Sequence, residues 1–551
     1  MRKLLTFIAA ILITGSLFAG GLVTNTNQSA MFTRLQNRNA STGIDAAYFN
    51  PAGLTKLGDG FFVSINNQTI TQTQKVISTY QYLTGTPKEY VGNVSAPLFP
   101  GVYLAYNTGK LSFSAGFNPI GGGGGAKYNK GLPSFEMNIA DIPPTLTSQG
   151  IPTNGYSADI YFKGSSVFLG YQANVGYKIN DMLSIAAGVR LVSAKNTYNG
   201  FLKNISINPN YVAFGSKYNG NMNPASQFFT DGQTYLTGVS AQLAGTASSL
   251  QPLITGGAGA VPLANGTAVG LTALQVATLQ GTITALGGNP AGMTIAQSQA
   301  FFSGASATYG AKAGILGENA SKTQDINVDA TESGTGITPI LSANFSPSDK
   351  LNIAVKYEFK TELNLKTKVA PDKGAGIFNN GETVIADMPA MLSVGVEYKP
   401  IKKLLFSASF NTYFDKNVDY DGSDSRTIDE IDKNFLEYGL GLEYGISEKL
   451  RVSGGWSHTD TGVNLNYQSD QSFSTNTNSF GAGFGYHLTP MIDLNIGGQY
   501  TFYKDGSKPF ASRLANMVPP IIPTPVAYTE TYKKSTWIVA IGLDFSFGKT
   551  K

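Results

Sequence analysis

The stretch Thr536–Phe547, TWIVAIGLDFSF, alternates between two kinds of side chain. Successive side chains of a β-strand point to opposite faces, so a strand here places every second residue on the same face. One face is wholly apolar and consists of Trp537, Val539, Ile541, Leu543, Phe545 and Phe547. The other face is mostly small or polar and includes Asp544. The pattern predicts a β-strand with one apolar side and one mostly polar side.

The same alternation recurs in pairs of segments that are joined by short polar turns. The six turns lie at residues 107–110, 180–181, 346–350, 400–403, 447–449 and 489–490. One further strand near 61–78 and one near 528–547 bring the total to fourteen. Several segments reach the length of about 9–11 residues that crosses a bilayer, against about 5–6 residues in ordinary strands. With long connections opposite the short turns, this predicts an all-β fold, a fourteen-stranded antiparallel transmembrane β-barrel.

The composition excludes several other classes of protein. Only 13% of the 551 residues are charged and 64 are glycine, whereas soluble proteins are roughly 25% charged. The chain has no cysteine, which excludes a disulfide scaffold and a Cys-ligated zinc site. With 39 basic and 35 acidic residues, the net charge of +4 is too balanced to indicate nucleic-acid binding. A mean hydropathy of −0.06 excludes a helical inner-membrane protein.

Candidate catalytic and metal-binding residues are scarce. The 2 histidines, His458 within a strand and His487 close to a turn, are not expected to share a Ser-His site, so the chain is interpreted as not an enzyme. Counting places His458 on the outer face, unless a bulge at Gly454-Gly455 resets the register. Residues 417–422 resemble the start of a calcium loop, but Ile428 replaces the required glutamate. An ordinary acidic loop fits better, and no cofactor or metal is expected.

The N-terminal residues predict export. Residues 1–19 read MRKLLTFIAAILITGSLFA, a basic start followed by a short apolar run and small residues, which is typical of a secretory signal peptide. A membrane-spanning anchor, the alternative, needs a longer apolar run. Export and a transmembrane barrel together indicate the outer membrane of a Gram-negative bacterium.

Residues 20–57 precede the first strand and do not alternate. A fourteen-stranded barrel encloses more volume than its inward side chains fill, so a further segment can occupy the lumen. Apolar residues such as Phe49 and Leu54 favour a plug over the alternative, a disordered lead-in. The expected organisation is a signal peptide at 1–19, an N-terminal plug, or hatch, at 20–57 and the barrel at 58–551.

A glycine run interrupts the third strand. Gly121–Gly125 follows Asn118 and Pro119 directly. Proline and glycine deny a strand its hydrogen bonds and packing, so this stretch is expected to kink or to end pairing. It lacks the Gly-Lys-Ser/Thr ending of a phosphate loop. The alternative is the flexible base of a loop.

The largest external loop covers residues 204–322 and contains Ala/Leu-rich stretches of helical character. Its low charge suggests that it packs on the barrel rim and offers an apolar groove to a ligand. The candidates for this groove are Phe228, Phe229, Phe301 and Phe302. A cap that packs on itself and binds no ligand is the alternative.

The plug, the fourteen strands and the stretch Asp45–Leu54, DAAYFNPAGL, resemble the FadL/TodX family of outer-membrane transporters for long-chain fatty acids and other hydrophobic compounds. The most specific part is the Asn-Pro-Ala motif where the plug joins the barrel. The resemblance implies plug-motif residues Asn50, Pro51, Ala52 and Gly53. It also implies lateral exit of the cargo at a kink in strand three, formed here by Asn118, Pro119, Gly121, Gly122 and Gly123.

Members of that family meet the carboxylate of a fatty acid with basic side chains. Lys195 falls at a basic position of the family, although simple alternation places it on the outer face. Arg190, Lys356 and Lys360 point inward by the same count and are further candidates. Glu358 lies between the last two in sequence, so a structural network of lumenal charges is the alternative.

The expected function is passive uptake of long-chain fatty acids or similar hydrophobic compounds. Cargo would enter by the external groove, occupy a pocket gated by the plug and leave through the kink. The expected partners are this cargo and the lipids of the outer membrane, and the protein is expected to be a monomer. A general diffusion porin and a structural outer-membrane protein are the alternatives. Cargo identity, the trigger of release and the role of the 204–322 loop stay open at this stage.

Overall fold

The computed structural model describes residues 29–374, 376, 378–418, 430–511 and 527–548. The expected signal peptide, the first residues of the expected plug (20–28) and most of the calcium-like segment (419–428) lie outside these ranges.

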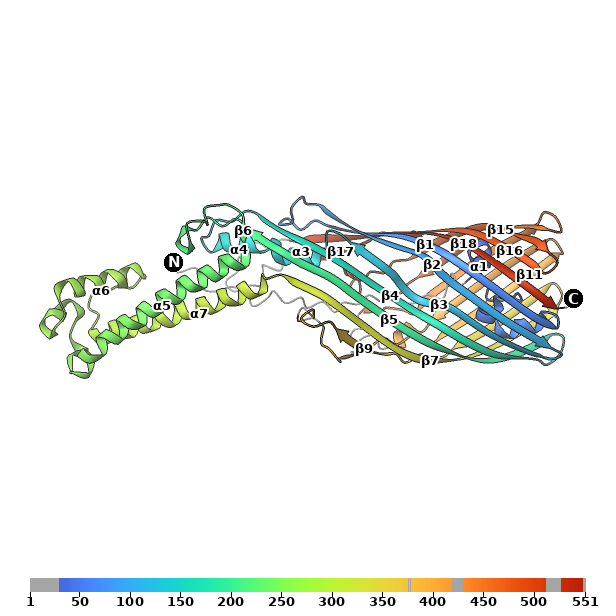
Figure 1. Cartoon of the computed structure of the whole chain (residues 1–551), viewed down its shortest axis with the longest axis horizontal. Coiled ribbons are helices and arrows are strands. Elements are labelled where there is room, and N and C mark those ends of the chain that lie inside the picture. Colours follow the sequence, from blue (N-terminus) through green and yellow to red (C-terminus); the bar gives the residue numbers. More distant parts are fainter. Residues whose placement is uncertain (1–28, 375, 377, 419–429, 512–526, 549–551) are drawn as a thin grey trace.

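Fourteen antiparallel spans form the wall of a closed barrel, as the alternation predicts (Figure 1). They are β1 (Gly60–Ser78), β2 (Lys88–Thr108), β3 (Leu111–Tyr128), β4 (Tyr156–Lys178), β5 (Leu183–Ile207), β7 (Ile326–Ser348), β8 (Leu351–Glu358) with β9 (Asn364–Val369), β10 (Thr383–Ile385) with β11 (Met391–Ile401), β12 (Leu404–Tyr413), β13 (Phe435–Gly445), β14 (Leu450–Asp460), β15 (Thr477–Thr489), β16 (Ile492–Tyr503) with β17 (Gly506–Phe510), and β18 (Tyr528–Gly548). A two-residue strand, β6 (Asn223–Pro224), pairs with the end of β5. Because β1 pairs with both β2 and β18, the wall has no free edge.

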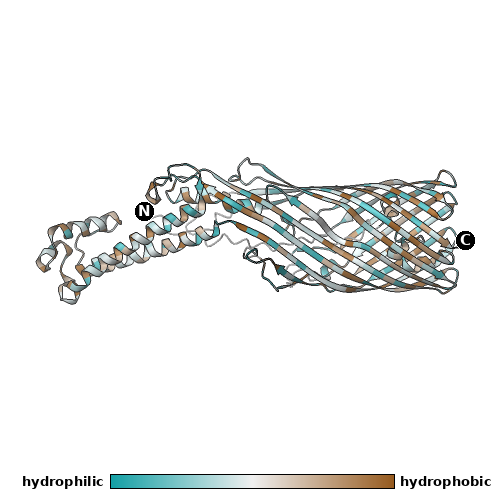
Figure 2. Ribbon diagram, viewed as in Figure 1, coloured by the Kyte–Doolittle hydropathy of each residue, from teal (hydrophilic) through white to brown (hydrophobic). Residues whose placement is uncertain are grey.

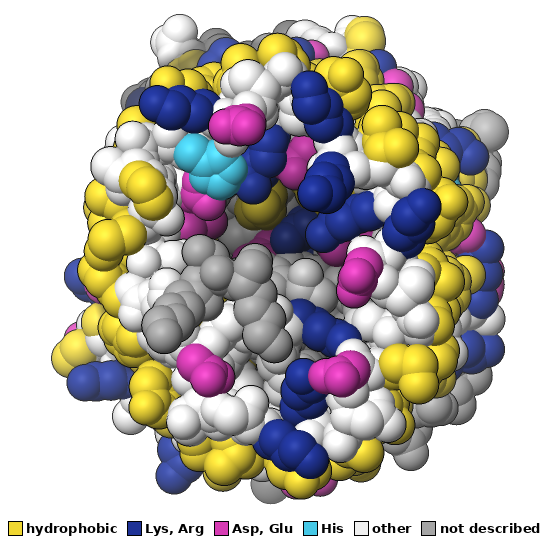
Figure 3. Space-filling view, turned by 90° about the vertical axis from the view of Figure 1, so that its right-hand side faces the viewer, with side chains coloured by type: hydrophobic (Ala, Val, Ile, Leu, Met, Phe, Trp, Pro, Cys, Tyr) yellow, Lys and Arg dark blue, Asp and Glu magenta, His cyan; other side chains and the backbone are white. Residues whose placement is uncertain are grey.

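The predicted short turns connect neighbouring strands at the end of the barrel where β18 finishes, which we call the turn end (Figure 1). Lys and Arg side chains gather there around the rim (Figure 3). The opposite end, the loop end, carries the long connections. They include α3 (Pro133–Ala140), α4 (Ile142–Ser148) and the short helix η5 (Asp415–Asn417).

The two faces of the wall differ as the period of two requires (Figure 2). On β18, Val539 and Ile541 are 60% and 52% exposed and point outward, whereas Ile538 and Ala540 are each 1% exposed and point into the lumen. The outer face therefore presents apolar side chains to lipid, and the inner face packs against the contents of the barrel.

His458 lies on the outer face, as counting along the strand indicates. β14 pairs with β13 and β15 without a shift of register, so the bulge considered at Gly454-Gly455 does not form. The imidazole packs beside Tyr438 and Trp456, with ring centroids 5.3 Å and 6.4 Å away. An amphipathic ring is at home among aromatic residues at a membrane–water boundary, which explains a histidine at an outward position.

The N-terminal segment packs inside the barrel, as predicted for a plug, and lies toward the turn end (Figure 1). It contains α1 (Ala30–Leu35), α2 (Ala46–Phe49) and the 3-10 helix η1 (Pro51–Lys56). The Ser29 hydroxyl accepts a hydrogen bond from the Phe32 N–H at 2.9 Å and caps α1.

A row of inward-facing glycines receives the plug backbone. A Cβ at these positions would lie 2.4–2.7 Å from backbone atoms of the plug, closer than real Cβ contacts allow. We call this row the glycine seat; it consists of Gly395, Gly441, Gly455, Gly481 and Gly497. Glycine in the middle of a strand marks close approach of another backbone. Part of the high glycine content therefore serves to fit the plug against the wall.

The large external loop forms a helical hairpin rather than a pad on the barrel rim. Its helices are η2 (Val212–Phe214), α5 (Ala225–Thr255), η3 (Ala258–Ala260), η4 (Leu263–Val269), α6 (Ala273–Ala285) and α7 (Ile295–Lys322). α5 and α7 pack along each other and project away from the barrel (Figure 1). Among the described residues, every helix is too short or too polar to cross a membrane.

We expect Gly481→Leu to release the plug while the barrel still forms, because the new side chain would overlap the Thr33 carbonyl. Trypsin should then cleave the released segment after Arg34 or Arg38 in the folded, heat-modifiable protein. Gly498→Leu is the matched control, since the atom nearest to a Cβ there is the Ile538 carbonyl oxygen at 3.9 Å. Equal protection of the plug in both variants would contradict the seat.

Candidate functional site

Asn50 of the Asn-Pro-Ala motif joins the plug to the wall. Its side-chain amide donates to Asn344 Oδ1 at 2.7 Å and to the carbonyl of Ser41 at 3.0 Å. A Cβ on residue 53 would lie 2.3 Å from Asn50 Nδ2, so the side chain can reach both partners only because Gly53 has none. The spacing of Asn50 and Gly53 in the motif thus has a steric reason.

The next two residues of the motif fix the backbone. Pro51 occupies the first position of η1, where its missing N–H leaves no hydrogen bond unmade. The Ala52 N–H donates to Ser342 Oγ at 2.9 Å, and the Ala52 carbonyl accepts from Ser184 Oγ at 2.8 Å. Two neighbouring strands of the wall, β5 and β7, therefore hold the plug at the turn end.

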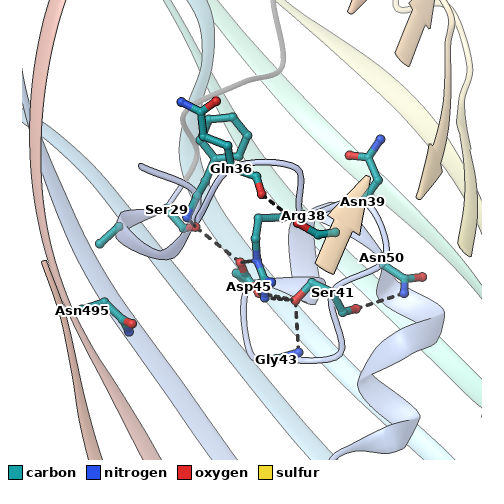
Figure 4. A network of polar contacts seen from close by, with 12 residues as sticks. Ser29, Gln36, Arg38, Asn39, Ser41, Gly43, Asp45, Asn50 and Asn495 are labelled. Atoms are coloured by element: carbon teal, nitrogen blue, oxygen red, sulfur yellow. Dashed lines mark hydrogen bonds and ion pairs between the residues drawn. The ribbon is translucent and has the colours of Figure 1, made fainter. Parts of the chain in front are cut away.

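Two buried arginines fasten the rest of the plug. Arg38 Nε donates to Asp45 Oδ2 at 2.9 Å within the plug (Figure 4). Its Nη1 donates to Glu397 Oε1 on β11 at 3.0 Å. Arg34 Nε donates to Asn495 Oδ1 on β16 at 2.9 Å, and its Nη1 pairs with Glu443 on β13. Each arginine thus joins the plug to the wall by an ion pair.

The predicted carboxylate candidates Arg190 and Lys356 lie inside the barrel and share one carboxylate. Arg190 Nη1 is 2.5 Å from Glu358 Oε2, and Lys356 Nζ is 2.7 Å from Glu358 Oε1. Lys356 also donates to the Tyr48 carbonyl at 3.0 Å, and both cations lie 4.8–4.9 Å from the centre of the Tyr48 ring. Arg190 and Lys356 are therefore better explained as members of a structural network of lumenal charges than as cations available to a ligand.

The other two basic candidates, Lys195 and Lys360, are exposed and stand outside this network. Lys195 is exposed on the outer face of β5, so the family position does not place it in a pocket here. The reason is that β5 and β4 stay in register around it, without the bulge that would turn the side chain inward. Lys360 follows the end of β8, is 41% exposed and lies 2.9 Å from Asp387 Oδ2.

The wall opens between β2 and β3. Pairing of these strands stops at Val102 opposite Phe117 and resumes only at Val94 opposite Ala126. We call this interruption the β2/β3 gap. The residues predicted for a kink in strand three all lie in it: Asn118, Pro119, Gly121, Gly122 and Gly123. Gly122 adopts a φ of +98°, a left-handed conformation that favours glycine.

A cavity of about 390 Å³ leads from the lumen into this gap. Its lumenal lining includes Gln72 on β1 and Thr536 on β18. Its lining also includes Leu98 on β2, together with Val167 and Leu169, which belong to the outward face of β4. Because side chains from both faces of the wall line one cavity, the cavity passes through the wall.

The gap touches the plug. Ile120 of β3 is 2% exposed and belongs to a buried cluster with Tyr48 and Phe49 of α2 and with Phe168 of β4. The Tyr48 and Phe49 rings meet edge to face with centroids 5.2 Å apart. The plug therefore supports the strand that borders the gap.

The four phenylalanines predicted to line an apolar groove do not form one surface. Phe228 and Phe229 are 0% and 1% exposed in a cluster at the base of the helical hairpin. Phe302 is buried, and Phe301 packs against it, in a separate cluster nearer the tip. The groove prediction is wrong for these residues, because an amphipathic stripe in a helical hairpin buries itself against the partner helix.

Sequence reasoning missed the polar side of the cavity. Alternation places Thr536 on the same mostly polar face as Asp544, but strand periodicity gives only the face of a residue and not the neighbours that it meets across the lumen. Within the described residues, no group of three or more His, Asp or Glu is arranged to hold a metal ion.

The comparison with solved structures identifies the fold. The chain aligns with a crystal structure of a Pseudomonas aeruginosa FadL homologue over 96% of its own length and 100% of the homologue, with a TM-score of 0.53 at 12% identity. The chain has the FadL fold. A closed antiparallel barrel with an apolar outer face is typical of outer-membrane barrels.

Other matches are weaker. The Pseudomonas putida toluene transporter TodX covers 95% of this FadL-like chain and 99% of its own, with 14% identity and a TM-score of 0.48. A family model described as a putative MetA-pathway of phenol degradation matches residues 390–512, less than a quarter of the chain. No curated protein matches the sequence.

We expect Glu358→Gln to lower the free energy of unfolding by about 3–5 kcal/mol, because it leaves two buried cations without their carboxylate. Lys360→Met is the control and should cost about 0–1 kcal/mol, since that ion pair is partly exposed. Denaturant titration of the protein in lipid vesicles measures both values. Unchanged stability of Glu358→Gln, with tighter binding of a carboxylate ligand, would instead assign Arg190 and Lys356 to cargo.

Proposed function

We propose that the chain is a passive outer-membrane transporter that takes up hydrophobic compounds and releases them sideways through the β2/β3 gap. The observation that carries this proposal is the cavity that reaches from the lumen to outward-facing side chains of β4. A long-chain fatty acid or an aromatic hydrocarbon would suit such a path.

A sideways path suits apolar cargo for an energetic reason. Moving an apolar chain back into water costs ~0.8 kcal/mol for each CH₂ group. At the gap the cavity is lined by apolar side chains such as Leu98, Pro119 and Leu169. Cargo that leaves there passes into lipid and keeps its apolar surface out of water.

The position of the gap supports release into the outer leaflet. Outward apolar side chains of β4 extend from Tyr177 at the turn end to Val167, a length typical of the about 9–11 residues that cross a bilayer. Val167 and Leu169 line the cavity, so the gap lies at the end of this band that is farther from the turn end. The turn end faces the periplasm in barrels of this class.

The plug argues against an open diffusion porin. It is held against the wall by the glycine seat and by the ion pairs of Arg34 and Arg38. A structural outer-membrane protein would have no need of an interrupted strand pair, which costs ladder hydrogen bonds. We propose no enzymatic role, because His458 faces outward and His487 lies at a turn beside Asp493.

We expect Gly121→Trp to reduce uptake to the level of cells without the protein, because the indole would fill the gap. Gly498→Trp on the outer face of β16 is the matched control and should transport at the parental rate. Uptake of radiolabelled oleate and toluene by cells that express each variant measures the effect, with heat modifiability as the test of folding. Normal uptake through a folded Gly121→Trp barrel would remove the lateral exit.

A further inference from the structure

The cavity behind the gap has two chemically different sides. Near β2 and β3 it is apolar. The wall from β13 to β18 is lined largely by hydroxyl groups, including Ser457, Thr459, Thr477, Ser479, Thr501 and Thr536. These hydroxyl groups can accept or donate hydrogen bonds to a polar ligand group, an interaction that a hydrocarbon cannot make.

One cation lies on the polar side. Lys534 of β18 lines the cavity, and its Nζ sits 5.1 Å from the ring centre of Phe473 and 5.4 Å from that of Tyr503. Within the described part of the chain, this Nζ has neither an ion pair nor a hydrogen bond to a protein group. The rings favour a cation, but they do not neutralise its charge.

Lys534 differs in this respect from four other cations that lie in the lumen. Arg34, Arg38, Arg190 and Lys356 each lie within 3.0 Å of a carboxylate oxygen. A cation enclosed without a counter-charge is costly, so a site that retains one is suited to a ligand that brings the opposite charge.

Neutral polar groups surround the position that such a ligand would take. Tyr503 Oη and Thr536 Oγ1 are 3.1 Å apart, and Thr536 Oγ1 donates to Gln72 Oε1 at 3.0 Å. All three residues line the same cavity as Lys534. Hydroxyl and amide groups can add hydrogen bonds to a charged head group and can solvate it in place of water.

The carboxylate in the cavity lining is engaged elsewhere. Glu437 of β13 accepts hydrogen bonds from Asn411 Nδ2 at 3.0 Å and from Thr459 Oγ1 at 3.5 Å. Three strands, β14 to β16, separate β13 from β18 along the wall. Glu437 therefore does not serve as the counter-ion of Lys534.

We propose that Lys534 binds the anionic head group of an amphiphile whose apolar chain lies toward the β2/β3 gap. The inference rests on the proposed transport function and narrows its cargo to singly charged carboxylates. The head group pairs with the ammonium between Phe473 and Tyr503, and the chain follows the apolar side of the cavity to Leu98 and Leu169. Release through the gap then requires the head group to leave Lys534 last.

The test compares a charged and a neutral ligand of equal chain length. Binding of oleate and of oleyl alcohol to the purified full-length protein is measured by calorimetry for the parent, Lys534→Met and Lys534→Arg. We expect Lys534→Met to weaken oleate binding at least tenfold, as loss of a charge-assisted contact does, and to leave oleyl alcohol within twofold. Lys534→Arg should restore oleate binding. Lys533→Met, on the opposite face of the same strand and paired with Asp505, is the matched control.

Each outcome decides a different point. Equal changes for both ligands, or no change for either, in a folded and heat-modifiable Lys534→Met protein would overturn the role of Lys534 while leaving transport intact. If the parent binds neither ligand while cells still take up toluene, this inference fails and the proposed function stands. If cells take up neither oleate, oleyl alcohol nor toluene, both fail. A stronger loss in Lys533→Met than in Lys534→Met would also overturn the assignment.

Discussion

A strand that faces lipid must satisfy its backbone hydrogen bonds within the protein, because the bilayer core offers none. Because β1 pairs with β18, the barrel is closed and backbone groups around the wall have a neighbouring strand to bond to. At the β2/β3 gap this pairing is interrupted, so backbone groups there need other partners. The sequence reduces the demand there: Pro97, Pro100 and Pro119 have no N–H to leave unpaired. Side chains of β1 supply partners as well, since the Phe99 N–H donates to Asn67 Oδ1 and the Pro97 carbonyl accepts from Asn67 and Thr69. The interruption is thus compatible with a stable barrel.

The plug and the gap depend on one another through packing. Arginine ion pairs and the glycine seat hold the plug from one side, and the cluster of Tyr48, Phe49 and Ile120 carries its position to the strand that borders the gap. The cations Arg34, Arg38, Arg190 and Lys356 are paired with carboxylates within this assembly. On the polar side of the cavity, by contrast, Lys534 has no carboxylate partner among the described residues. Its positive charge can be balanced by a bound ligand.

The sequence predicts the fold well, because one physical rule decides it. Alternation with a period of two is imposed at every outward position by lipid, so turns, strands and the inward direction of Arg190 and Lys356 follow from counting. Contacts across the lumen do not follow from that rule. Lys195 is basic like the family's pocket residues, yet its side chain lies on the outer face of the barrel. Phe228 and Phe302 belong to apolar helix faces that are buried in the clusters of the helical hairpin. Lys534 carries no signal in sequence, since what distinguishes it is the lack of a partner in three dimensions.

The origin of the glycine seat in the chain constrains how the protein is assembled. The plug comes first in the chain, whereas all five glycines of its seat lie in β11 to β16, several hundred residues later. Most of the wall must therefore be synthesised before the plug has a surface to rest on. The pairing of β1 with β18 is the step that encloses it. The plug therefore has its complete seat only once the strands that carry the five glycines have paired.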